Sequence, residues 1–434
     1  MTFYKNITLF FCIILSANIL SAQQTPAPPQ SGSVLIMGGV AHLGNGEIIE
    51  SSVIAFENGK LTLVADGRLV RINPANYNQV VDATGKHIYP GLIAPNSTIG
   101  LVEVSAVRAT RDYSEVGQMN PNIRSIIAYN TDSKVTPTVR SNGVLLAQIT
   151  PRSGRISGSS SIVELDAWNW EDAIYKEDVG IHLNWPSMFK WSWGSNAQVI
   201  NKNKDYEKQV AEIESFFDQA KAYTNKQEPE NKNLKFEAVR GLFDKSQKLF
   251  VHTNRAKTIM EATLFAKKHN VDVVIVGGRD SWRITEFLKD NNVPIIIRST
   301  QSLPGAEDED IDQPFKTPKQ LHDAGILFCF SHSGFDTQRN LPFQAGQTVG
   351  FGLPYEEAIK ALTLNTAKIF GLDQSVGSLE EGKDATLFIS EGDVLDMRTC
   401  KVTHAFIQGK TIDLDNKQKA LYRKFKAKYD TQGR

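Results

Sequence analysis

The second half of the chain repeats one pattern, in which a short apolar run is followed by an amphipathic stretch. The apolar runs occupy residues 248–254, 271–278, 293–300 and 326–332. Their near-continuous hydrophobicity is typical of parallel strands that are buried on both faces. Amphipathic stretches predict helices at 204–225, 256–269, 281–291 and 355–370. Repeated strand–helix units of this kind favour a barrel or a doubly wound parallel sheet, and therefore the α/β class.

Both ends of the chain carry β signals instead. Residues 33–66 alternate apolar runs with glycine-containing turns, and so do residues 376–390 and 402–414, as expected for short antiparallel strands. Because these fragments flank one central α/β region, we expect them to pair in space.

The N-terminus has the features of a secretory signal peptide. Lys5 precedes an apolar run from Ile7 to Leu20, and small residues follow at Ser21 and Ala22, which is the usual order of a signal peptide. An uncleaved anchor is the alternative. We therefore expect an exported protein, periplasmic or secreted, with no membrane span in its mature form.

Composition narrows the class of partner and the source of stability. The 48 basic residues balance 48 acidic ones, so the chain lacks the basic excess of a nucleic-acid-binding protein. Cys329 and Cys400 are the only cysteines after the signal peptide, and two cysteines do not make a disulfide framework. A buried core must hold the fold together.

Several longer motifs resemble the amidohydrolase superfamily, in particular its imidazolonepropionase-like branch. They are DATGKHIYPGLI (82–93), VHTNRA (251–256), RNLPFQAG (339–346) and EEAIKALTLNTAKIFGLDQSVGSLEEGKDATLFI (356–389). The resemblance implies a (β/α)8 TIM-type barrel with a small composite β-sandwich built from both chain ends. It also implies hydrolysis of non-peptide carbon–nitrogen bonds, of the cyclic amide or imidazolone type, by metal-activated water at the C-terminal face of the barrel.

These observations predict a domain order. The expected segments are a signal peptide (1–22), a Pro-rich tether (23–32), the N-terminal part of the sandwich (33–88), the barrel (89–373), the C-terminal part of the sandwich (374–416) and a basic helix (417–434). The apolar residues of the last helix fall on one face, and we expect this face to pack on the domain.

The resemblance fails at the metal ligands. The first barrel strand of the family ends Pro-Gly-x-x-Asp-x-His-x-His. Aligned on Pro90-Gly91, these three ligand positions hold Ala94, Asn96 and Thr98. On the fifth strand His252 fits the expected histidine, whereas the sixth offers only Gly277 and Gly278. A catalytic zinc site needs three protein ligands, and amide or hydroxyl oxygens replace imidazole poorly. One zinc-like divalent metal on His252 is one expectation for the cofactor, and no metal is the other.

Other residues are candidates for chemistry without the usual metal. His332 and Asp336 follow the eighth strand and could form a general base with its orienting carboxylate, or a loop with a local hydrogen bond. Asn96, Thr98, His252 and Arg279 are candidate substrate-binding residues. The run 150–161, TPRSGRISGSSS, resembles an anion-cradling loop with Arg152 and Arg155 available, although it lacks the lysine of a P-loop.

Three functions remain open at this point. The first is a hydrolase with an atypical or lost metal site. The second is an inactive exported paralogue that binds a small ligand in the former active site. The third is a partner subunit, in a homo- or hetero-oligomer with a related amidohydrolase. The first two predict a small-molecule substrate or ligand.

Overall fold

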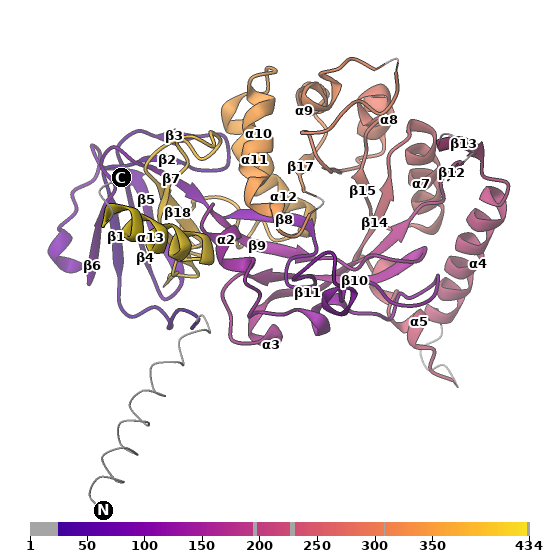
Figure 1. The fold of residues 1–434 in the computed structure, drawn as a ribbon, viewed down its shortest axis with the longest axis horizontal. Coiled ribbons are helices and arrows are strands. Elements are labelled where there is room, and N and C mark those ends of the chain that lie inside the picture. The colour runs from indigo at the N-terminus through magenta and orange to yellow at the C-terminus, as the bar shows by residue number, and fades with distance from the viewer. Residues whose placement is uncertain (1–24, 194–197, 226–230, 308, 333, 432–434) are drawn as a thin grey trace, which may run out of the picture.

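The structure is a computed structural model that describes residues 25–193, 198–225, 231–307, 309–332 and 334–431. The expected signal peptide and the first two residues of the tether lie outside this part. Figure 1 shows two lobes side by side. One is rich in β-strands and contains both ends of the described chain, and the other is built around a large sheet with helices outside it.

The large sheet has eight strands in the order β17-β16-β15-β14-β11-β10-β9-β8. The strands are β8 (Leu92–Ser97), β9 (Val144–Ile149), β10 (Ile156–Glu164), β11 (Ile174–Asn184), β14 (Lys248–Thr253), β15 (Val273–Gly277), β16 (Ile295–Ile297) and β17 (Phe328–Phe330). The edge strands β8 and β17 both contact α11 and α12, so these helices span the gap between the two edges. The result is the predicted TIM-type barrel, nearly closed.

One strand departs from the parallel order. β10 pairs antiparallel with both β9 and β11, whereas every other neighbouring pair in this sheet is parallel. Only residues 150–155 join β9 to β10, which is too short for the crossover of a dozen or more residues that parallel neighbours need. The glycine- and serine-rich run is therefore a hairpin connection followed by a barrel strand.

Helices lie between the barrel strands, and those at 206–224 and 256–269 occur where the sequence predicts them. They are α2 (Thr136–Arg140), α3 (Trp170–Ala173), α4 (Tyr206–Thr224), α5 (Leu234–Glu237), α6 (Arg240–Phe243), α7 (Ala256–His269), α8 (Thr285–Asp290), α9 (Gln313–Asp323), α10 (Leu341–Val349), α11 (Tyr355–Leu362) and α12 (Leu364–Phe370). A hairpin of β12 (Phe189–Trp193) and β13 (Gln198–Lys202) precedes α4. The helix expected over 355–370 is two helices, because Thr363 leaves the helical conformation (φ −128°, ψ −93°).

The barrel interior is filled by an apolar layer below its C-terminal end. Ile93, Leu146, Ile162, Phe250, Val274, Ile296 and Cys329 belong to one buried cluster that also includes side chains of α12. Successive residues of a strand alternate between its faces, so the side chains two positions further along lie above this layer. On β14 and after β16 these positions hold His252 and Arg298.

The β-rich lobe joins the two chain ends. One sheet has the order β5-β4-β1-β6 and the other β20-β19-β18-β7-β2-β3. Their strands are β1 (Val34–Met37), β2 (Val40–His42), β3 (Ile48–Ile49), β4 (Ser52–Glu57), β5 (Lys60–Asp66), β6 (Gln79–Asp82), β7 (His87–Pro90), β18 (Leu387–Ser390), β19 (Val402–Ile407) and β20 (Lys410–Thr411). β18 pairs antiparallel with β7, and Phe56 packs edge-on against Phe406 at 5.0 Å between ring centres. The pairing of the N- and C-terminal fragments is confirmed.

The C-terminal helix α13 (Lys417–Asp430) does not pack as expected. It has no buried residue, and Tyr422 is 67% exposed. Its contacts with the barrel lobe are polar, from Asn416 to Ser141 and from Gln418 to Thr138. The expected packing of this helix is wrong because amphipathic spacing shows that a helix has an apolar face, but not what covers that face.

Among the described residues, no helix combines the length and the apolar character needed to cross a bilayer.

Candidate functional site

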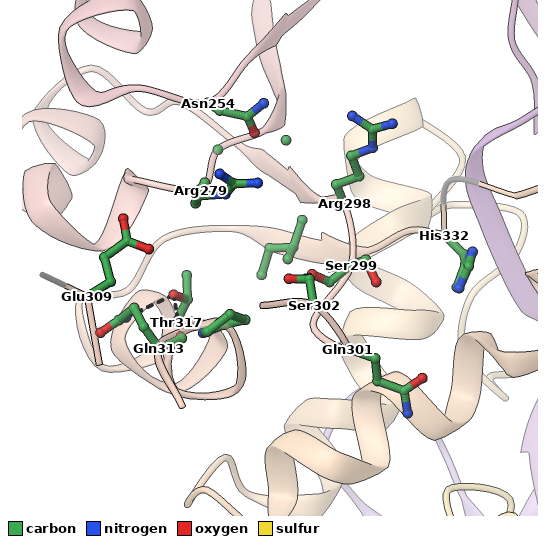
Figure 2. Close-up of a pocket in the computed structure, with 14 residues that line it drawn as sticks. Asn254, Arg279, Arg298, Ser299, Gln301, Ser302, Glu309, Gln313, Thr317 and His332 are labelled. Carbon is green, nitrogen blue, oxygen red and sulfur yellow. Dashed lines mark hydrogen bonds between the residues drawn. The ribbon is translucent and has the colours of Figure 1, made fainter. Parts of the chain in front are cut away.

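The C-terminal ends of the parallel strands open into a pocket of about 370 Å³. Figure 2 shows its lining side chains, which come from the residues that follow β14 (Asn254), β15 (Arg279), β16 (Arg298, Ser299) and β17 (His332). The opposite wall is the start of α9, with Gln313 and Thr317. Barrel enzymes place their chemistry at this end of the sheet.

A second, larger pocket of about 770 Å³ adjoins the first, because Asn254 and Arg279 line both. His252 lines this second pocket together with Trp185 and Arg255. The two pockets together form what we call the barrel mouth. Two residues predicted from the sequence to bind a substrate, His252 and Arg279, therefore lie at one continuous opening.

His252 forms a hydrogen bond with a second histidine of the barrel. The strands β11 and β14 are parallel neighbours, which brings Nδ1 of His182 to 2.9 Å from Nε2 of His252. The other ring nitrogen of His182 lies 2.8 Å from the hydroxyl of Ser160. Phe250 stacks on the His182 ring at 4.9 Å between ring centres, which holds the imidazole in place from below.

The surrounding hydrogen bonds fix which nitrogens carry protons. Oε1 of Gln148 accepts the backbone N–H of Asn96 at 2.8 Å, so its amide nitrogen donates to the Ser160 hydroxyl oxygen at 2.9 Å. The Ser160 hydroxyl then donates to Nε2 of His182, whose Nδ1–H donates to Nε2 of His252. His252 in its neutral form consequently carries its own proton on Nδ1.

Both imidazoles are neutral at pH 7. Burial lowers the pKa of His182 well below its ordinary value, and the neighbouring His252 and Arg152 lower it further. Burial likewise lowers the pKa of His252, and the positive charges of Arg152 and Arg298 add to the effect. A neutral imidazole in a low-dielectric interior avoids the cost of a buried charge.

These pKa shifts predict a loss of stability in acid. The pKa of each histidine is lower in the folded chain than in the unfolded chain, so below pH 6.5 the unfolded chain binds protons that the folded chain does not. The contribution of the two neutral histidines to the free energy of unfolding is therefore fully present above that pH. Below that pH, this contribution falls by up to about 1.4 kcal/mol per pH unit for each histidine. Urea denaturation from about pH 7.5 to about pH 5.5 measures this slope. The slope should decrease in His252→Gln, and an unchanged slope would contradict the assignment.

Asn96 and Thr98 lie inside the fold at the end of the first barrel strand. They are 1% and 7% exposed. The Asn96 carbonyl accepts a hydrogen bond from Nη2 of Arg152 at 2.6 Å, and its side-chain oxygen is buried without a hydrogen-bond partner among the described residues. Arg152 thus reaches inward from the hairpin between β9 and β10, whereas Arg155 pairs with Glu212 at 2.8 Å.

His332 is arranged as a hydrogen-bond donor rather than as a base. Its Nδ1 accepts the backbone N–H of Gly334 at 3.2 Å and lies 2.8 Å from the Thr337 hydroxyl. Burial lowers the pKa of this imidazole, so the neutral ring carries its proton on Nε2. Asp336 is exposed and forms no hydrogen bond with His332; Thr337 occupies the place expected for the orienting carboxylate.

The donor set does not fit a divalent metal. The described residues contain no group of three or more His, Cys, Asp or Glu side chains that could hold an ion. The Nε2 lone pair of His252 already accepts a hydrogen bond, and Asn96 and Thr98 offer only neutral oxygens. The nearby guanidinium charges of Arg152 and Arg298 would also repel a cation. The expectation of a metal on His252 gains no support from this geometry.

Sequence reasoning missed His182 and Arg298. His182 lies in GIHLN, within a stretch that gave no clear strand order. Arg298 directly follows the three isoleucines of the run 293–300. The signal that was available is the alternation of strand side chains between two faces. Arg298 lies on the same strand face as Ile296, and His252 lies on the same face as Phe250.

Comparisons with known proteins show a match to one family over part of the chain and a shared fold over most of it. Residues 247–412 match the sequence profile of the amidohydrolase family, and no curated protein matches the chain. An amidohydrolase from Thermotoga maritima MSB8 is 22% identical with a TM-score of 0.74, over 88% of this chain and 99% of that one. A Xaa-Pro dipeptidase with bound methionine is 14% identical with a TM-score of 0.54, over 88% and 100%. An adenosine deaminase from Xanthomonas campestris with bound zinc is also 14% identical, with a TM-score of 0.52, over 93% and 99%.

Proposed function

We propose that the barrel mouth binds a small molecule with a non-peptide carbon–nitrogen bond, without a metal centre, because residues 247–412 match the amidohydrolase family and the fold is similar to that of an amidohydrolase. The matched family and the fold are those of hydrolases. The ligand class that we propose, a cyclic amide or imidazolone, follows from the branch that the sequence motifs resemble. The proposal concerns an exported protein that uses the former active site for binding.

One observation carries this proposal, the hydrogen bond from His182 to His252 at 2.9 Å. It occupies the ring nitrogen that would otherwise be free for a metal, in the layer directly above the apolar barrel interior. The neutral tautomers then leave Nδ1–H of His252 and Nε2–H of His332 as donors. An amide or imidazolone carbonyl accepts such donors.

The energetics of water activation favour binding over turnover. Metal coordination lowers the pKa of water from about 15.7 to about 7, which corresponds to about 12 kcal/mol at most. A positioned general base contributes only about 10²- to 10⁴-fold, and in these tautomers neither His252 nor His332 has an unused lone pair on its ring. We therefore propose that the protein holds its ligand without rapid hydrolysis.

Ligand-dependent stabilisation tests this function. The mature protein is screened by thermal denaturation against cyclic amides, imidazolones and cyclic ureides, with and without added zinc or manganese. We expect at least one compound to raise the melting temperature with no product formed. Turnover that requires the added metal would overturn the proposal in favour of the hydrolase alternative. A His182→Phe variant, which removes the donor to His252, should weaken binding, whereas His322→Phe, outside the mouth, should not.

A further inference from the structure

The barrel mouth contains arginines that have no carboxylate partner. Arg279 and Arg298 line the first pocket. Within the described part of the chain, neither they nor Arg152 forms an ion pair, whereas several arginines elsewhere are paired. The paired residues are Arg68 with Asp66, Arg140 with Asp166, Arg155 with Glu212, Arg240 with Glu237, Arg398 with Asp396 and Arg423 with Asp415.

Arg152 and Arg298 lie close enough to repel each other. Burial and the charge of Arg298 lower the pKa of Arg152 to about 10, so the Arg152 guanidinium remains charged at pH 7. One carboxylate, Glu309, also lines the pocket, and its Oε2 accepts the backbone N–H of Gly305 at 2.6 Å. It balances one of the two arginines that line the first pocket, so this pocket retains an excess of positive charge.

The neutral groups of the first pocket also donate hydrogen bonds. His332 presents Nε2–H, and Asn254 and Ser299 add an amide and a hydroxyl. Figure 2 shows Asn254 and Arg279 on one side of the opening and Arg298 and His332 on the other. Ile297 and Pro314 supply apolar surface. Guanidinium groups match carboxylates in geometry as well as in charge.

We infer that the barrel mouth recognises a small organic acid, whose carboxylate binds between Arg279 and Arg298. This inference rests on the proposed function of the mouth and names the charge of its ligand. The carboxylate would supply the counter-charge that Arg279 and Arg298 lack, and the amide part of the ligand would extend toward His252 in the adjoining pocket.

Two matched pairs of compounds test the inference. Calorimetric titration of the mature protein compares N-acetylglycinate with N-acetylglycinamide, and glutarate with glutaramide. Each pair has nearly the same shape and differs in charge. We expect the acids to bind about tenfold or more tightly than the amides, because hydrogen bonds to charged groups are worth about 1.5–3 kcal/mol. Added salt should weaken binding of the acids.

Variants locate the contact. Arg279→Gln and Arg298→Gln should each weaken binding of the acids by about tenfold and weaken binding of the amides much less. Arg283→Gln is the control, because this arginine lies near the mouth over the Trp282 ring but does not line the pocket. Far-UV circular dichroism confirms that each variant is folded.

Three outcomes would overturn the inference. They are equal binding of acids and amides, unchanged acid binding in both pocket variants, and no binding of either acid. Equal binding would leave the proposed amide site intact and remove only its charge preference. Failure of the proposed function itself would be recognised separately, as metal-dependent turnover.

Discussion

Asp166→Ala is expected to lower the free energy of unfolding by about 3–5 kcal/mol, because it leaves a buried guanidinium without its counter-charge. Asp166 and Arg140 form an ion pair in which both side chains are 3% exposed. Arg140 also donates to the carbonyl of Leu165 at 2.9 Å and to that of Asp413 at 3.2 Å. Asp166 accepts the backbone N–H of Ala27 at 2.8 Å. The pair therefore ties the barrel to segments from both chain ends.

Urea denaturation of the mature protein measures this loss. Asp323→Ala is the control, because Asp323 pairs with Lys319 on the surface of α9 with its side chain 54% exposed. Exposed pairs contribute about 0–1 kcal/mol. A double variant, Arg140→Met with Asp166→Leu, should recover much of the loss, since apolar replacement of a buried pair is often neutral. Equal effects of Asp166→Ala and Asp323→Ala would contradict the role given to this pair.

Phe250→Ala is expected to cost about 3–5 kcal/mol of unfolding free energy, the range for truncating a buried aromatic residue. Phe250 is fully buried in the barrel interior. It contacts Phe370 of α12 at 5.9 Å and His182 at 4.9 Å between ring centres. The substitution opens a cavity directly below the histidine pair, so it should also weaken ligand binding at the mouth.

Two further variants test whether the loss of stability comes from a cavity in a packed interior. Phe250→Leu keeps more of the volume and should lose less stability. Phe189→Ala removes a phenylalanine that is 51% exposed, and it should change the unfolding free energy by no more than about 0.5 kcal/mol. A loss in Phe250→Ala no greater than that in Phe189→Ala would show that this position is not part of a packed interior.

Much of the fold could be predicted from local pattern. The apolar runs that became β14, β15, β16 and β17 were visible because strands buried on both faces are apolar throughout. The β fragments at the chain ends were visible because glycine turns separate them. These signals depend on neighbouring residues in the sequence, and a single sequence contains that information.

The features that were missed depend on tertiary register. The antiparallel direction of β10 follows from the short link 150–155, but only once both flanking strands are known to be barrel neighbours. The contact between His182 and His252 joins residues 70 positions apart and needs the pairing of β11 with β14. The exposed face of α13 depends on what packs against it, which periodicity does not contain.

The candidate site was predicted in part. The sequence predicts that the metal-binding histidines of the family it resembles are replaced by Asn96 and Thr98, because the Pro90-Gly91 motif fixes the alignment, and this stays a prediction. The two arginines of the first pocket could not be inferred as a pair, because Arg279 and Arg298 follow two different strands. Their convergence is a property of the barrel, whose C-terminal strand ends meet at one face.

Metal content is the most direct test of the account. The mature protein is produced in medium supplemented with zinc, manganese and iron, purified without chelators and analysed by inductively coupled plasma mass spectrometry beside His252→Ala. We predict metal contents far below one equivalent that are the same in both proteins. Near-stoichiometric metal in the unmodified protein that is lost in His252→Ala would contradict the claim that the His182–His252 hydrogen bond has replaced the metal centre.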